Sequence, residues 1–473
     1  MKRIFFLGAL VLLILNLVQA GITELLDDEA YYWIYSRKLE WGYYDHPPMI
    51  ALMIKAGYSL FHSEFGIRLF SCLAIGFCPF VMYAIIKPKE PIRLLAIIFS
   101  LGLIQFGGFL AVPDAPLVFF SAVYLLTFKN FLKEDSWLNS FLLGLVMAFL
   151  IYSKYQGLLI IIFSVIANLH LLFNKKYLFS IMMGALLMTP YMFWQFSHGL
   201  PTLGFYLKER NNSSHYQLYY TIDYILGQLF LFGPLIGWMF LVAATAIIPS
   251  GDNWIRTLKT IVWGVTGFFF FASFSMPIET NWTAVAIIPA ILLLYYYLEQ
   301  SPRMEKVLFR LVPFSLAIIL FIRVCFVTDI LGDKVSLNKE LHQNKTWTAG
   351  IKEKARGYPV YFINSYQLAS KYIYYQHGVA TSYNDIYYRN NQYDLWKPES
   401  NWLADSILVV STNKNYVSRD SVSSNQGKLY CQMFANPNLN VNYGFLSQIP
   451  PRKVLVPFID RRRLKFSLSP ERK

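Results

Sequence analysis

Residues 4–22 read IFFLGALVLLILNLVQAGI and contain no charged side chain. A helix needs about 20 apolar residues to cross the hydrocarbon core of a bilayer, so this stretch predicts a membrane-spanning helix. Lys2 and Arg3 before it and Gln19-Ala20 near its end also suit a cleaved signal peptide. The length of the apolar run favours a retained span over a cleaved peptide.

Similar apolar runs recur along the first two thirds of the chain, and together they predict about eleven transmembrane helices. The other runs cover residues 67–86, 92–112, 115–128, 137–153, 157–173, 177–194, 222–248, 258–276, 282–298 and 307–327. The sequence therefore predicts a mostly α-helical, polytopic membrane protein.

The composition of the 473 residues agrees with this class. Apolar residues make up 55% and charged residues only 15%, whereas a soluble globular domain carries about 25% charged residues. This balance excludes an ordinary soluble enzyme, a disordered chain and a fibrous protein. The four cysteines form no disulfide framework and show no zinc-site spacing.

Lysine and arginine in the short loops predict the orientation, because cytoplasmic loops are enriched in them. With the N-terminus in the cytoplasm, most cations of the membrane part fall in cytoplasmic loops, and the opposite loops hold most of its acids. We predict a transmembrane domain over residues 1–327 with a first outer loop at 23–66. A small extracytoplasmic α/β domain is expected at 328–473, with short strands near 358–363, 372–375 and 406–411.

Three groups of acids lie on the predicted outer side, next to apolar spans where a charge is costly. Asp28 and Glu29 follow the first span, where an acid also suits a helix N-cap. Asp45 and His46 precede two prolines, which fix the backbone and begin the next helix. Asp114 lies between two prolines in a short turn that needs no acid.

Cations and hydrogen-bonding groups accompany these acids. Lys154 lies in a short outer loop, where a snorkelling side chain is the alternative to an anion ligand. Arg68 and Arg210 also lie on the outer side. Outward-facing cations can hold a phosphate leaving group while a carboxylate deprotonates an incoming hydroxyl. Further hydrogen-bonding groups at the same depth suit a sugar pocket, although an interfacial tryptophan belt is the alternative: Glu279, Asn281 and Trp282.

Six short segments, taken in order, resemble the membrane glycosyltransferases of the GT-C fold. The resemblance is to the lipid A aminoarabinose transferases, the RgtA/B/C/D-like glycosyltransferases and the protein O-mannosyltransferases. The segments, which lie within the first 300 residues or so, are DEAYYW (28–33), GYYDHPPM (42–49), GIRL (66–69), PDAPL (113–117), SKY (153–155) and NW (281–282).

The resemblance implies an enzyme that moves one sugar from a polyprenyl-phosphate carrier, usually with inversion, to an acceptor outside the cytoplasm. It assigns the catalytic base to Asp28, the second acid of the fold to Asp114, and a phosphate contact to Lys154. The acid-and-cation pair before the prolines maps to Asp45 and His46. Many aminoarabinose-transferase-type members have Glu-Lys there, so a weaker or pH-dependent phosphate contact is expected.

We therefore predict a bacterial inner-membrane enzyme with these site residues. The catalytic set is Asp28, Asp45 and Asp114. The substrate-binding set is Glu29, His46, Arg68, Lys154, Arg210, Glu279, Asn281 and Trp282. The acceptor class stays open between lipid A, another glycolipid, a glycan and a protein. No nucleotide cofactor and no nucleic-acid partner are expected, and the need for a divalent cation stays open.

Two other functions were weighed against this one. A transporter or flippase for a lipid-linked glycan should show repeated halves and charges near span centres, whereas here the acids gather on one side. A membrane-anchored assembly protein that works through its tail leaves Asp28, Asp45, Asp114 and Lys154 without a role.

Overall fold

The computed structural model describes residues 1–205, 216–249, 253–334, 336–385, 388–396, 406–417, 419–424 and 427–435. Its contacts divide the chain into two compact units. The helical unit contains residues 1–22, 46–193 and 210–324, and the mixed unit contains residues 23–45, 194–209 and 325–473. The domain boundary predicted after residue 327 stays a prediction, and the contacts group first-loop residues 23–45 with the C-terminal part.

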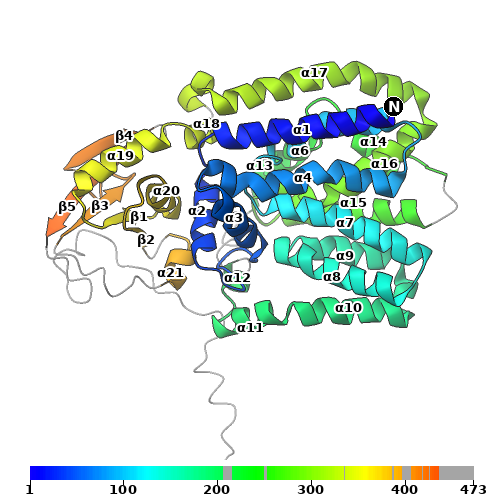
Figure 1. Ribbon diagram of the computed structural model, residues 1–473, viewed down its shortest axis with the longest axis horizontal. Helices are drawn as coiled ribbons and strands as arrows, with labels where there is room; N and C mark the ends of the chain where they lie inside the picture. Colours follow the sequence, from blue (N-terminus) through cyan, green and yellow to red (C-terminus); the bar gives the residue numbers. More distant parts are fainter. Residues whose placement is uncertain are drawn as a thin grey trace, which may run out of the picture. The chain divides into compact units, whose positions relative to one another are not determined.

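The helical unit is built from helices that follow the predicted apolar runs, apart from the helix at Met49–Leu60, which lies within the predicted first outer loop (Figure 1). Their bounds are α1 (Lys2–Ile22), α3 (Met49–Leu60), α4 (Glu64–Ile86), α5 (Pro91–Phe99), α6 (Gly102–Phe106), α7 (Asp114–Lys133), α8 (Trp137–Ser153), α9 (Gly157–Ala167), η1 (Leu169–Phe173), α10 (Lys175–Leu187), α11 (Thr189–Ser197), α13 (Leu218–Leu231), α14 (Gly237–Thr245), α15 (Trp254–Ala272), η3 (Thr280–Ala286), α16 (Ile287–Gln300) and α17 (Pro302–Val327). The last residues of α11 and α17 belong to the mixed unit.

Every one of the predicted runs contains helix, but several runs are broken. Among the described residues, six helices are long and apolar enough to cross a membrane, or seven if α10 and α11 form one span bent by 43°. The run at 92–112 is divided into α5 and α6, and the run at 222–248 into α13 and α14. Hydropathy detects the length of an apolar run but not a break in the helix within it. The sequence therefore predicts more continuous spans than the structure contains among its described residues.

Close packing in the helical unit depends on small residues at the helix crossings. α1 packs on α4 and α4 on α7, which run side by side in Figure 1. Where α3 packs on α4, a Cβ on Gly57 would collide with the carbonyl oxygen of Gly66. Glycine at this position therefore lets the two helix backbones touch.

The mixed unit contains a five-stranded sheet with helices. Its elements are α2 (Asp27–Arg37), α12 (Pro201–Gly204), η4 (Asp329–Lys334), α18 (Ser336–Leu341), α19 (Asn344–Ala355), β1 (Val360–Ile363), α20 (Tyr366–Gln376), β2 (Ala380–Tyr383), α21 (Gln392–Leu395), β3 (Ser406–Ser411), β4 (Asp420–Ser424) and β5 (Gly427–Ala435). The predicted α/β character of the C-terminal part is thereby confirmed.

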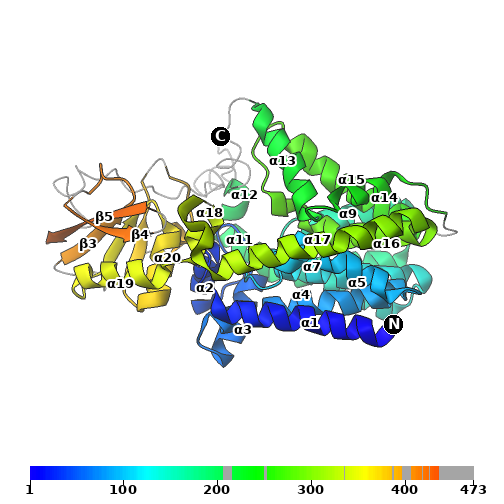
Figure 2. The same ribbon diagram turned by 90° about the horizontal axis from the view of Figure 1, so that it is seen from above.

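The strand order is β2-β1-β3-β5-β4. β1 runs parallel to both neighbours, with Val360 opposite Ala380 and Leu408, while β5 is antiparallel to β3 and β4. α19 and α20 pack on the sheet, and Figure 2 shows α19 alongside β3 and β4. All four residues of β1 are buried, as expected for a central parallel strand.

The strand predicted near residues 372–375 is wrong, because these residues lie within α20. Ser365 caps this helix by accepting a hydrogen bond from the Leu368 backbone nitrogen at 3.2 Å. Tyr372 and Ile373 are buried where α20 packs on α2 and on the sheet. Tertiary burial therefore overrides the β preference of this aromatic segment.

Candidate functional site

The helical unit contains a buried ion pair between two predicted site residues. Nζ of Lys154 lies 2.8 Å from Oδ1 and 3.0 Å from Oδ2 of Asp114. The two residues are 3% and 4% exposed. Asp114 is the first residue of α7 and Lys154 follows the last residue of α8, so each charge faces the favourable end of its helix dipole. This placement offsets part of the cost of burying them.

Asn281 joins this pair and completes a group that we call the Asp114 centre: Asp114, Lys154 and Asn281. Nδ2 of Asn281 donates to Oδ2 of Asp114 at 2.8 Å. Asn281 lies on η3, whose Trp282 is buried against Phe269, while Glu279 just before η3 is exposed. The structure thus brings together three predicted site residues from distant parts of the sequence.

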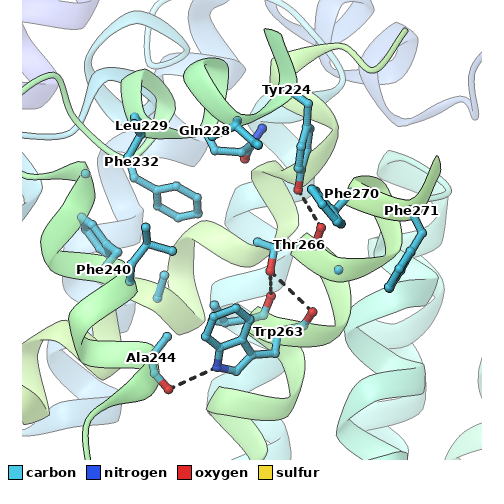
Figure 3. A pocket seen from close by; sticks show the side chains of 16 residues that line it. Tyr224, Gln228, Leu229, Phe232, Phe240, Ala244, Trp263, Thr266, Phe270 and Phe271 are labelled. Atoms are coloured by element: carbon cyan, nitrogen blue, oxygen red, sulfur yellow. Dashed lines mark hydrogen bonds between the residues drawn. The ribbon is translucent and has the colours of Figure 1, made fainter. Parts of the chain in front are cut away.

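An apolar cavity of about 500 Å³ lies within the helical unit among α13, α14, α15 and α16. Its walls are mainly aromatic and aliphatic, and Figure 3 shows Phe232, Phe240, Trp263 and Phe271 around it. The few polar groups are engaged within the protein. Trp263 donates to the Ala244 carbonyl at 3.2 Å, and Tyr224 donates to the Thr266 carbonyl at 2.7 Å. Such a lining suits a hydrocarbon chain.

One wall residue of this cavity is hydrogen-bonded to the segment that carries Asn281. Thr283 of η3 donates to Oε1 of Gln228, and Nε2 of Gln228 donates to the Thr280 carbonyl at 3.4 Å. Gln228 therefore connects the apolar cavity with η3, and η3 carries the amide that contacts Asp114.

The three acids at the start of α2, Asp27, Asp28 and Glu29, have different surroundings. Glu29 is fully buried, and its Oε2 accepts a hydrogen bond from the Leu26 backbone nitrogen at 3.0 Å, which closes the first turn. Asp27 pairs with Lys371, whose Nζ lies 2.5 Å away. Asp28, between them, is exposed.

Asp45 pairs with an arginine that sequence reasoning missed. Nη2 of Arg389 donates to Oδ2 of Asp45 at 3.1 Å and to the Tyr366 hydroxyl at 2.7 Å. The Tyr35 hydroxyl donates to the other Asp45 oxygen. Burial and the Asp45 carboxylate raise the pKa of Tyr35 well above its ordinary value, so the phenol stays protonated and donates. We call these four residues the Arg389 cluster.

Arg389 keeps capacity to bind something else. Its side chain is 32% exposed, although its Nε is buried and has no hydrogen-bond partner within the described ranges. The guanidinium stacks 4.7 Å from the Tyr366 ring centroid and 5.2 Å from that of Phe205. A partly exposed planar cation held by aromatic faces suits an anionic ligand.

A second missed cation, Lys371, lies beside the start of α2. It is fully buried and donates to the Glu340 carbonyl at 2.6 Å and to Asn344 Oδ1 at 3.0 Å, in addition to pairing with Asp27. Burial and the neighbouring carboxylates of Asp27 and Asp28 raise the pKa of Glu340 to about 7, although Lys371 opposes this. The first turn of α2 is thus held by residues of the C-terminal part.

The remaining predicted site residues have other surroundings. Arg68 is fully buried in α4, and its Nη1 donates to the Ala20 carbonyl at the end of α1 at 3.1 Å. His46 follows Asp45 in the chain and is partly buried. Arg210 lies outside the described residues. In the described ranges, no cluster of three or more His, Cys, Asp or Glu side chains could hold a metal ion.

One sequence signal could have pointed to Arg389. The stretch from Asp385 to Trp396 is rich in tyrosine and asparagine and contains a single cation, which is unusual for a solvated loop. Lys371 lies in an ordinary helical pattern and carries no such signal.

Comparison with known proteins gives a family match and one curated relative. Residues 45–194 match the family described as dolichyl-phosphate-mannose-protein mannosyltransferase. Over 256 residues the chain is 24% identical to the lipid A galacturonosyltransferase RgtD of Rhizobium johnstonii, a region that is 51% of this chain and 53% of that protein. The chain thus spans about half the length of the curated relative it matches.

Two solved structures share the fold along most of the chain. ArnT from Cupriavidus metallidurans in the apo state matches with a TM-score of 0.66 at 14% identity, covering 92% of this chain and 98% of that one. The structure of the same protein bound to undecaprenyl phosphate matches with a TM-score of 0.63 at 14% identity, covering 93% and 99%. The GT-C fold predicted from the sequence is thereby confirmed, and the chain is a multi-pass membrane protein with this fold, in which residues 45–194 match the mannosyltransferase family model.

Proposed function

We propose that this protein is a glycosyltransferase of the bacterial inner membrane. It takes one sugar from a polyprenyl-phosphate donor and transfers it, with inversion, to a lipid, glycan or protein acceptor outside the cytoplasm. The N-terminus is cytoplasmic, and residues 328–473 form the extracytoplasmic domain. The relatives support this reading, since one acts on lipid A and another was solved with undecaprenyl phosphate.

The observation that carries the proposal is the Asp114 centre. Burying a lysine inside an apolar helical unit costs free energy unless an opposite charge compensates it. In this protein Nζ of Lys154 lies 2.8 Å from Oδ1 of Asp114. We assign Lys154 to the donor phosphate, which leaves as the sugar is transferred. Asp114 and Asn281 hold the ammonium group in place.

The apolar cavity supports a donor with a long hydrocarbon tail. Its volume of about 500 Å³ and its aromatic walls accommodate several isoprene units without burying an unpaired polar group. Gln228 connects this wall to η3, which also carries Asn281. Binding of the hydrocarbon chain of the donor is therefore linked to Asn281 through this segment.

We assign the general base to Asp28, because this acid is exposed at the start of α2. The base accepts the proton of the acceptor hydroxyl as its oxygen bonds to the anomeric carbon. The bond from that carbon to the phosphate oxygen then breaks. Asp45 keeps its place in the site by holding Arg389, and we assign the exposed part of this guanidinium to an anionic group of the substrates.

Transfer of a labelled sugar tests the proposal. Purified protein receives a labelled polyprenyl-phosphate sugar and a pool of envelope lipids and glycans, and mass spectrometry identifies the product. We expect a new glycosidic bond with the wild type and a loss of about 10²–10⁴-fold with Asp28→Asn. Asp135→Asn, at an exposed acid of the helical unit, is the matched control. Movement of intact donor across the bilayer without a new bond would instead establish the transporter.

A further inference from the structure

A second cavity, of about 640 Å³, lies in the helical unit where α4 and α7 end and α15 begins. Its lining contains four basic residues, Lys87, Lys129, Lys133 and His170, and no described lining residue is acidic. The cavity is distinct from the Asp114 centre and from the apolar cavity, because it shares no residue with either.

Lys129 is fixed in place at this cavity. Its Nζ donates to the Ile85 carbonyl at the end of α4 at 2.8 Å and lies 5.3 Å from the centre of the Trp254 ring. Lys87 and Lys133 are exposed and make no ion pair with any residue in the described ranges. The cavity therefore carries positive charge that the described residues do not neutralise.

The start of α15 adds to the positive electrostatic potential of this cavity. Trp254, its first residue, lines the cavity together with Asn253, and the N-terminus of a helix of 19 residues attracts anions. The rest of the wall contains two asparagines, Asn130 and Asn168, and aliphatic residues that include Ile86, Leu126 and Leu132. Cations beside aliphatic side chains match a molecule that carries a phosphate next to acyl chains.

We propose that this cavity binds the headgroup of an anionic phospholipid. The lysines contact the lipid phosphate, and the aliphatic wall contacts the glycerol backbone and the first acyl carbons. Basic pockets between membrane helices on the cytoplasmic side are suited to such headgroups, and the loops here are those predicted to be cytoplasmic. The inference does not rest on the proposed transferase activity.

The test compares lipid retention by native mass spectrometry of the full-length protein in detergent. The probes are equal amounts of phosphatidylglycerol and phosphatidylcholine. The pocket variant is Lys87→Gln with Lys133→Gln, which removes exposed cations that hold no partner in the fold. Its matched control is Lys89→Gln with Lys175→Gln, which removes the same charge from residues outside the cavity. Ala84→Trp fills the cavity mouth and keeps every lysine.

We expect the wild type to retain phosphatidylglycerol over phosphatidylcholine. The pocket variant should raise the apparent dissociation constant about tenfold or more, since each lysine near a lipid surface contributes severalfold in affinity. Ala84→Trp should lower retention likewise, and the control should stay within about twofold.

Equal losses in pocket variant and control would overturn the proposal, because they would show a general effect of surface charge. Unchanged retention of phosphatidylglycerol in the pocket variant and in Ala84→Trp would overturn the proposal as well. Full displacement of phosphatidylglycerol by millimolar inorganic phosphate would show that the site takes free phosphate and not a lipid. A melting curve for each variant confirms that the fold is intact.

Discussion

Arg389 donates a hydrogen bond to Asp45 at 3.1 Å, although 344 residues separate them in the chain. The same nitrogen donates to the Tyr366 hydroxyl, and Tyr35 donates to the second Asp45 oxygen. The guanidinium is thus held by an acid of the first loop and by an aromatic ring of the C-terminal part. It is fixed in orientation before any substrate arrives, which lowers the entropic cost of binding an anion.

We therefore predict that Arg389→Ala raises the KM for the donor and lowers kcat/KM about 10- to 100-fold, as loss of a charged hydrogen bond does. Arg389→Lys should recover only part of the loss, because an ammonium group cannot contact Asp45, Tyr366 and a ligand in one plane. Arg419→Ala, at an exposed arginine of the same unit, is the control. If the effects of Arg389→Ala and Asp45→Asn simply add in the double variant, the two residues do not act together.

The Asp114 centre gives a prediction about stability. Lys154→Met leaves the Asp114 carboxylate buried without its cation and should destabilise the protein by about 3–5 kcal/mol. Lys154→Met combined with Asp114→Leu should recover most of the melting temperature, since no isolated charge remains. Lys176→Met breaks the exposed pair with Asp135 and should leave the melting temperature nearly unchanged.

Both Lys154 variants should lose sugar transfer whatever their stability, because the phosphate contact is absent in each. A double variant as unstable as the single one would show that packing, and not the buried charge, accounts for the loss. Unchanged donor affinity in the folded double variant would count against the phosphate role of Lys154.

Gly267 offers a way to fill the apolar cavity without strain. It lines the cavity, and a Cβ added there meets no atom within 4 Å. Gly267→Leu should keep or raise stability, since leucine favours a helix over glycine by about 1 kcal/mol. We expect it to raise the KM for a donor with a long isoprenoid chain several times more than for a short-chain analogue. Thr260→Leu, on the same helix and outside the cavity lining, should leave both KM values unchanged.

Glu340 predicts how stability depends on pH. Its pKa is raised to about 7 by burial and by Asp27 and Asp28, so the folded state binds a proton that the unfolded state has released. Between about pH 4.5 and pH 7, stability therefore falls as pH rises, by an amount on the order of 2 kcal/mol. Glu340→Gln should flatten this part of the curve and raise the melting temperature near pH 8. A curve with the same slope in wild type and variant would assign the dependence to another group.

The sequence predicts the helical unit well, because a membrane span is a local property of composition. It also singles out Asp114, Lys154 and Asn281 one by one, since each is a polar residue beside an apolar run. It does not predict that they touch, because helix packing brings residue 281 to residue 114 across intervening spans.

The mixed unit is harder to predict from the sequence. Arg389 and Lys371 act through contacts with residues more than 300 positions away, and no local period marks them. The segment at 372–375 has the residues of a strand and becomes a helix because α2 and the sheet bury it. The acids of the first loop can therefore be singled out from the sequence, whereas the cations that pair with them cannot.

The grouping of residues 23–45 with the C-terminal part has a consequence for biogenesis, because the chain is synthesised from its N-terminus onward. The ribosome makes Asp27 and Asp45 long before Lys371 and Arg389, and the spans made in between must insert meanwhile. The first loop therefore lacks these two cations until Lys371 and Arg389 have been made. The ion pairs that hold this loop therefore form late in folding.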